Sequence, residues 1–137
     1  MASEVKVKGY FGEESGGSLE GIVAVRFVTR GMAGTLTIEY LGRYGVTVPY
    51  KTVEQFAAIA RRKAKLAGAN QTTEEAVNID GFYSDGGTRM LPGKVEMWLR
   101  SKRGFETLTV EFGRRGQISL PYAVVEDLIH RERRHYF

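Results

Sequence analysis

Two stretches of this chain, GTLTIEYLGRYGVTVPYKTVEQF at residues 34–56 and ETLTVEFGRRGQISLPYAVVEDL at residues 106–128, match each other without a gap. They belong to a longer repeat, because the sequence aligns with itself, positions 5–65 matching positions 77–137. Identical pairs run through both units, among them Gly9/Gly81, Gly21/Gly93, Thr37/Thr109, Pro49/Pro121 and Tyr50/Tyr122. The chain is therefore an internal duplication.

Each unit alternates apolar and polar residues in four runs and ends in a run with helical spacing. Alternation with β-branched and aromatic residues between glycine-rich breaks indicates strands. The predicted strands are 5–11, 22–28, 35–40 and 45–48, then 77–83, 94–100, 107–112 and 117–120, with a helix after the fourth strand of each unit. One such unit cannot bury both faces of its sheet, but two can.

We therefore expect an α+β fold of two ββββα repeats, with antiparallel sheets packed with two helices in one pseudo-twofold domain. This single domain spans residues 1–137, with repeats at 5–65 and 77–137 joined by a short polar linker at 68–76. The most apolar alternating set is predicted to face the core: Val23, Val25, Phe27, Val95, Met97 and Leu99.

Composition narrows the classes of function. Hydrophobic residues make up 42% of the 137 residues and charged residues 26%, which is typical of a globular chain. The absence of cysteine excludes disulfides, thiolate metal sites and a cysteine nucleophile. No apolar run is long enough for a membrane helix and no secretion signal is evident, so we expect an intracellular protein that does not enter membranes. The net charge of +4, with thirteen arginines, is compatible with a nucleic-acid partner.

The lone tryptophan lies on the outward side of its predicted strand. Lys94, Trp98 and Arg100 share that side, so an aromatic ring stands between two cations. Base stacking with phosphate neutralisation needs this combination. Trp98 could instead cover a helix or lie in a dimer interface.

The first strand offers a similar set, with Lys6, Lys8 and Tyr10 on one side. Arg26 points outward from the second strand. Asp80 takes the place of Lys8 in the second unit, so we expect phosphate to be bound less well there. Packing in the core is the alternative for Tyr10.

Glycine-flanked turns between the third and fourth strands carry Arg43 in one unit and Arg114 and Arg115 in the other. Such turns let an arginine fork approach phosphate. The alternative is a solvated hairpin whose charges discourage edge pairing.

Catalytic residues are scarce. The two histidines, His130 and His135, are five residues apart, which is not the spacing of a helical metal pair, and acidic residues are not clustered at ligand spacing. We expect no enzyme activity, no metal and no cofactor.

The passages YGVTVPYKTVEQF (44–56) and RGQISLPYAVVEDL (115–128) each combine a glycine, a short hydroxyl-bearing strand and a helix start. FYSDGGTRMLPG (82–93) leads from a strand into a loop with glycine and proline. In these features and in strand order the chain resembles the single-stranded nucleic-acid-binding superfamily of Pur-alpha, the Whirly proteins and the transcriptional coactivator positive cofactor four. The Lys-Gly-Lys-Ala-Ala run of Whirly proteins is absent, and a two-repeat Pur-like module is closest in length. The resemblance implies binding of single-stranded DNA or RNA.

Together these features predict a sequence-tolerant single-stranded DNA- or RNA-binding protein of replication, repair, transcription or RNA metabolism. Its predicted contacts are Lys6, Lys8, Tyr10, Arg26, Arg43, Lys94, Trp98, Arg100, Arg114 and Arg115. The alternative is a protein-interaction module that docks on a partner such as RNA polymerase. A homodimer is compatible with either function.

Overall fold

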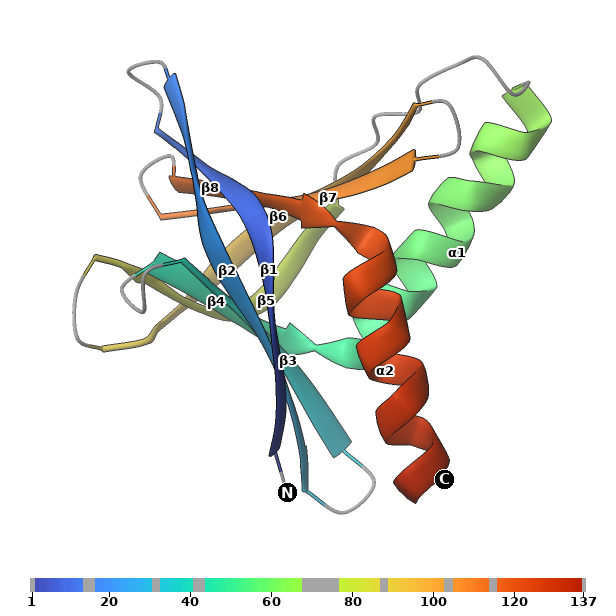
Figure 1. The fold of residues 1–137 in the computed structure, drawn as a ribbon, viewed down its shortest axis with the longest axis horizontal. Helices are drawn as coiled ribbons and strands as arrows, with labels where there is room; N and C mark the ends of the chain where they lie inside the picture. Colours follow the sequence, from blue (N-terminus) through green and yellow to red (C-terminus); the bar gives the residue numbers. More distant parts are fainter. Residues whose placement is uncertain are drawn as a thin grey trace.

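The computed structural model describes residues 2–13, 17–30, 33–40, 44–67, 77–86, 89–102, 105–113 and 116–136. The first half contains β1 (Ala2–Glu13), β2 (Gly17–Arg30), β3 (Ala33–Tyr40), β4 (Tyr44–Pro49) and α1 (Tyr50–Ala67). The second half contains β5 (Val77–Asp85), β6 (Leu91–Lys102), β7 (Phe105–Phe112), β8 (Gly116–Pro121) and α2 (Tyr122–Tyr136). The elements therefore follow one another in the predicted order, and the strands extend beyond the predicted ranges (Figure 1).

The eight strands form one closed antiparallel barrel, in which each strand pairs with its neighbours in sequence and β8 pairs with β1. The predicted fold class, two ββββα repeats whose separate sheets pack with the helices, is therefore wrong. The two halves are joined by strand pairing, because Tyr44–Thr47 of β4 pair with Phe82–Asp85 of β5. Tyr10–Gly12 of β1 pair in the same way with Gln117–Ser119 of β8.

Closure has a simple physical reason. Backbone groups at a sheet edge need hydrogen-bond partners, and joining the edges of two twisted sheets supplies these partners. Alternation along a strand reports its two faces but not its neighbours. The sequence pattern is therefore compatible with open sheets and with a barrel alike.

The interior of the barrel is filled by alternate side chains of its strands. The six residues predicted to face the core are all buried, which confirms that assignment: Val23, Val25, Phe27, Val95, Met97 and Leu99. Further buried side chains come from the other strands, including Leu36, Ile38, Val46, Val48, Leu108, Val110, Ile118 and Leu120. An eight-stranded barrel is just wide enough for such side chains to fill it.

The two helices lie beside each other on one side of the barrel (Figure 1). Each starts directly after the proline that ends the preceding strand, and its first residue is a buried tyrosine. The apolar stripe of each helix is also buried: Val53, Phe56, Ala57 and Ala60 in α1, and Val125, Leu128 and Ile129 in α2. Outside this stripe the exposed polar residues of the described part include Lys51, Gln55 and Arg62 of α1 and Asp127, His130 and Arg131 of α2, whereas Glu132 is buried.

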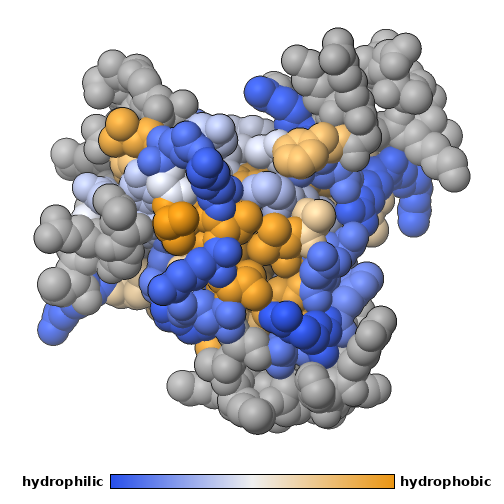
Figure 2. All heavy atoms as spheres, viewed as in Figure 1, coloured by the Kyte–Doolittle hydropathy of each residue, from blue (hydrophilic) through white to orange (hydrophobic). Residues whose placement is uncertain are grey.

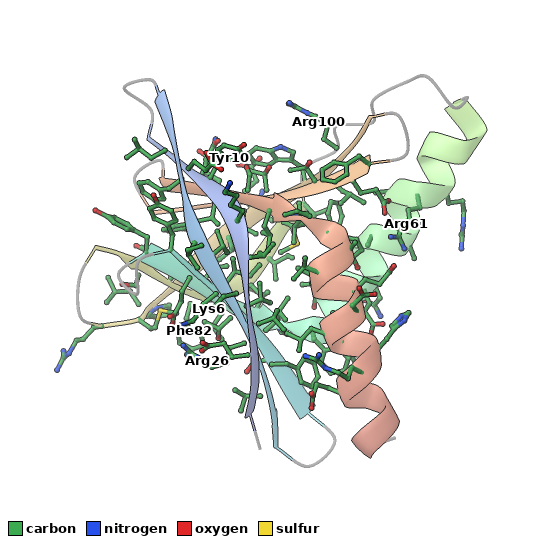
Figure 3. The ribbon with its side chains drawn as sticks, viewed as in Figure 1. Lys6, Tyr10, Arg26, Arg61, Phe82 and Arg100 are labelled. Carbon is green, nitrogen blue, oxygen red and sulfur yellow. The ribbon has the colours of Figure 1, made fainter. Side chains whose placement is uncertain are left out.

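Arg61 ties the helices to the barrel. From α1 it donates two hydrogen bonds to Glu106 of β7, at 2.5 and 2.8 Å, and one to Glu126 of α2, at 2.5 Å. Its guanidinium carbon lies 5.1 Å from the ring centre of Tyr122. The hydrogen bonds to Glu106 and Glu126 raise the pKa of Arg61, and burial raises the pKa of Tyr122. Figure 3 shows Arg61 between the two helices.

Two cross-strand glycine pairs occupy equivalent positions in the duplicated barrel. Gly9 of β1 is opposite Gly21 of β2, and Gly81 of β5 is opposite Gly93 of β6. In each case the glycine of the first strand comes directly before the short ladder that joins the two halves.

These positions have no room for a side chain. A Cβ atom at Gly9 would lie 2.6 Å from the carbonyl oxygen of Ser119, and one at Gly81 would lie 2.7 Å from the carbonyl oxygen of Thr47. Both oxygens belong to the backbone of the facing strand, so they can give way only if that strand moves. Glycine therefore allows β1 to approach β8, and β5 to approach β4, closely enough to close the barrel.

We predict that Gly81→Ala lowers the free energy of unfolding by about 1–3 kcal/mol, because the added methyl group overpacks the joint between β4 and β5. Urea denaturation would measure the effect. Asn78→Ala, at an exposed position of the same strand, is the control and should change stability by less than about 0.5 kcal/mol. Equal stability of the two variants would contradict a steric role for Gly81.

We also predict that Arg61→Met destabilises the protein by about 1–2 kcal/mol, since Glu106 and Glu126 lose their shared cation. The value lies at the low end for charged hydrogen bonds because 39% of the Arg61 side chain is exposed. Thermal unfolding of Arg61→Met and of the double variant Arg61→Met/Glu126→Gln tests this, because removing one carboxylate should recover part of the loss. A double variant less stable than the single one would rule out carboxylate repulsion as the cause.

Candidate nucleic-acid interface

Tyr10 and Phe82 occupy equivalent positions on the outside of the barrel. Each residue is paired with a strand on both sides: Tyr10 is opposite Ser119 of β8 and Glu20 of β2. Phe82 is opposite Thr47 of β4 and Pro92 of β6. Tyr10 is 50% exposed and Phe82 49% exposed, so neither ring is part of the core. The alternative of core packing for Tyr10 is thereby excluded.

A cleft of about 260 Å³ opens beside Tyr10, where the pairing of β1 with β8 ends. We call it the β1–β8 cleft, and its lining residues are Lys8, Gly9, Tyr10, Phe105, Thr107, Ser119, Leu120 and Pro121. Phe105, at the start of β7, is 60% exposed and supplies the second aromatic ring of the cleft. Figure 2 shows apolar side chains gathered beside β1 with hydrophilic side chains around them.

Local sequence explains the shape of the cleft. The pairing of β1 with β8 ends at Tyr10, Gly9 lines the cleft with backbone alone, and the adjacent Leu120 points into the barrel core. Ser119 points outward by alternation, and its hydroxyl shares a hydrogen bond of 2.9 Å with the hydroxyl of Thr109. The cleft therefore combines two aromatic rings, an apolar floor and hydroxyl groups.

Lys6 and Lys8 alternate along the outer side of β1, as predicted, and both are exposed. The ammonium of Lys8 lies 3.1 Å from a carboxylate oxygen of Glu20, and that of Lys6 lies 4.0 Å from Glu4. Exposed ion pairs of this kind contribute only about 0–1 kcal/mol. A phosphate group can therefore compete with these carboxylates for both lysines.

Arg26 is held more firmly by its neighbours. It donates a hydrogen bond of 3.1 Å to Glu4 and bonds of 3.2 and 3.4 Å to Glu39. Partial burial lowers the pKa of Arg26, but the hydrogen bond to Glu4 and the charge of Glu39 outweigh that effect and raise it. Two carboxylates thus neutralise the predicted phosphate contact at Arg26.

Of the other predicted cations, Lys94 lines the hollow between β5 and β6, and Arg100 of β6 is opposite Thr107, which lines the β1–β8 cleft. Lys94 is exposed on β6, with its ammonium 2.5 Å from Asp80. Arg100 is exposed further along β6, and Figure 3 shows it apart from Lys6. The predicted contacts Arg43, Arg114 and Arg115 lie outside the described residues.

Trp98 is half-buried and packs against the core cluster. It is on the outer side of β6, as predicted, opposite Thr109 of β7. The part of its ring that packs on the barrel is unavailable for stacking. Tyr10 and Phe105 expose more of their rings than a half-buried residue can.

The surroundings of Phe82 differ from those of Tyr10. A second hollow, of about 340 Å³, lies on the β6 side of Phe82 and is lined by Asp80, Gly81, Phe82, Pro92, Gly93 and Lys94. Its lysine is paired with a carboxylate, and among its described lining residues only Phe82 is aromatic. In the aligned repeats, the counterpart of Phe105 is Ala33 and that of Lys8 is Asp80.

Sequence reasoning placed Lys8 and Tyr10 in the interface but missed Phe105, Ser119 and Pro121. A signal was present, because an aromatic residue stands in one repeat where the other has Ala33. Such a difference between two otherwise similar units marks a position whose role has diverged. The strands that neighbour this aromatic residue can be identified only from the closed barrel.

Other chemistry finds little support in the structure. Within the described ranges, no three acidic or histidine side chains gather as a metal site would require. The helices α1 and α2 border a hollow of about 270 Å³, but Arg61 is already paired there with Glu106 and Glu126. Among the residues that the structure describes, no helix is long and apolar enough to cross a membrane.

Comparison with known proteins gives no assignment, since no family model, no curated protein and no solved structure matches this chain.

Proposed function

We propose that this protein binds single-stranded nucleic acid, with an unpaired base of the strand stacking in the β1–β8 cleft. The observation that carries the proposal is the pair of exposed aromatic rings, Tyr10 and Phe105, lining one cleft together with Lys8. Stacking on protein rings contributes roughly 1–3 kcal/mol per base and requires bases that are free of a duplex.

The lysines of β1 provide a path for the phosphate backbone next to the cleft. Lys6 and Lys8 are two residues apart, so their Cα atoms are separated by roughly 6.5 Å along the strand. Their ion pairs with Glu4 and Glu20 exchange for contacts with phosphate, and counterions leave the nucleic acid. Affinity should therefore fall as salt concentration rises.

The proposed binding tolerates many sequences. Every base has a ring face that can stack, and the hydroxyl groups available to contact base edges among the described lining residues are those of Tyr10, Thr107 and Ser119. This agrees with the resemblance to the superfamily of Pur-alpha, Whirly proteins and positive cofactor four. On this proposal the protein acts in replication, repair, transcription or RNA metabolism.

We predict that Tyr10→Ala weakens binding of a single-stranded oligonucleotide by about 1–3 kcal/mol, roughly 5- to 150-fold. Fluorescence anisotropy at low and moderate salt measures this with a labelled strand of roughly thirty nucleotides. The matched control is Phe82→Ala, which removes an equally exposed ring from the equivalent position and should change the affinity less than about twofold.

Two outcomes would refute the proposal. One is unchanged affinity on Tyr10→Ala, and the other is a duplex that binds as tightly as the single strand. Circular dichroism of both variants shows that the barrel is retained.

A protein-interaction module is the second candidate, and exposed apolar residues outside the cleft favour it. Leu19 is 65% exposed, Ile22 54% and Leu91 50%, and Leu19 and Leu91 are equivalent in the two repeats. A partner such as RNA polymerase could cover these side chains. This candidate would be favoured by absence of oligonucleotide binding together with a partner that wild-type protein captures and Leu19→Ser does not.

A further inference from the structure

The two halves of the barrel are not equivalent at their joints. Beside Tyr10 the chain places a second ring, Phe105, and a cation, Lys8. At the corresponding positions of the aligned repeat the sequence has Ala33 and Asp80. A methyl group cannot stack on a base, and a carboxylate repels phosphate.

The size of the β1–β8 cleft limits its occupant. Its volume of about 260 Å³ lies just below the range of roughly 300–1,000 Å³ that holds drug-sized ligands. One planar ring system fits such a space, whereas a run of several stacked bases does not. Apolar contacts come from Leu120 and Pro121, and the rings of Tyr10 and Phe105 supply stacking surfaces.

The positive charge of Lys8 at the edge of the cleft is suited to a negatively charged group attached to that ring system. Lys8 is 77% exposed, and its partner Glu20 is itself 50% exposed, so their ion pair is solvated and weak. A phosphate carried by the bound base can take the place of Glu20. A base joined through its sugar to a phosphate is a nucleotide.

We infer that the β1–β8 cleft is a pocket for a single nucleotide, that it binds a free nucleoside monophosphate, and that the equivalent joint at Phe82 does not. This inference rests on the proposed function, because it specifies that the ligand unit bound at that site is one nucleotide. It adds that the pocket recognises one base with its phosphate, independently of the rest of a strand.

The experiment is an NMR titration of the full chain with adenosine monophosphate and, separately, with adenosine, following assigned aromatic side-chain signals. The ring signals of Tyr10 and Phe105 are expected to shift and saturate, while those of Phe82 stay unchanged. Adenosine monophosphate should bind roughly 3- to 10-fold more tightly than adenosine, because only the phosphate contacts Lys8.

Two kinds of variant separate a binding role from a structural one. Lys8→Gln should retain the affinity for adenosine and lose the advantage of the phosphate. Phe105→Ala removes a mostly exposed ring and should weaken both ligands by roughly 5- to 150-fold. Because Lys8 is a surface residue, Lys8→Gln keeps the test meaningful even if Phe105→Ala fails to fold.

The inference is overturned by shifts centred on Phe82, by a phosphate advantage that persists in Lys8→Gln, or by no saturable shift. An oligonucleotide titration of the same sample distinguishes failure of the single-nucleotide pocket from failure of the proposed function. If the oligonucleotide still binds through Tyr10, the single-nucleotide pocket fails and the proposed function stands. If it does not bind either, both fail.

Discussion

The barrel depends on how closely β1 can approach β8, and β5 can approach β4. At both joints a glycine lies against a backbone carbonyl of the facing strand, at a distance that a Cβ atom would not tolerate. Gly9 and Gly81 are identical between the repeats, as are their cross-strand partners Gly21 and Gly93. This close approach lets the short ladders form that join the two halves, so the shared core and the position of both helices follow from it.

The same constraint creates the candidate site. Because Gly9 faces inward, its neighbours Lys8 and Tyr10 face outward, at the place where β1 separates from β8. The end of the pairing leaves a hollow that Tyr10 and Phe105 line with their rings. Structural closure and binding surface thus share one position in the chain. At the other joint closure is preserved while Asp80 replaces the cation, so the two repeats are alike in their core and different in their outer chemistry.

The order of strands and helices was predictable because the same pattern occurs in both repeats, so each assignment rests on two stretches of sequence. Alternation identified the strands and the buried side of β2 and β6, since burial at every second residue requires it. Closure was not predictable, because pairing between β4 and β5 and between β8 and β1 depends on twist and sheet edges, which a single strand does not encode. For the site, Lys8 and Tyr10 were identifiable as outward residues. The neutralisation of Arg26 was not, because Glu4 and Glu39 reach it from two other strands, and neither was the contribution of Phe105 from β7.

The most direct test of the central claim is photocrosslinking of a single strand that carries 5-iodouracil, followed by mass spectrometry of the crosslinked peptides. If an unpaired base of the strand stacks in the β1–β8 cleft, crosslinks will form at Tyr10 and Phe105. Crosslinks confined to Trp98 or Phe82 would contradict this placement of the bound strand, and with it the link between barrel closure and binding.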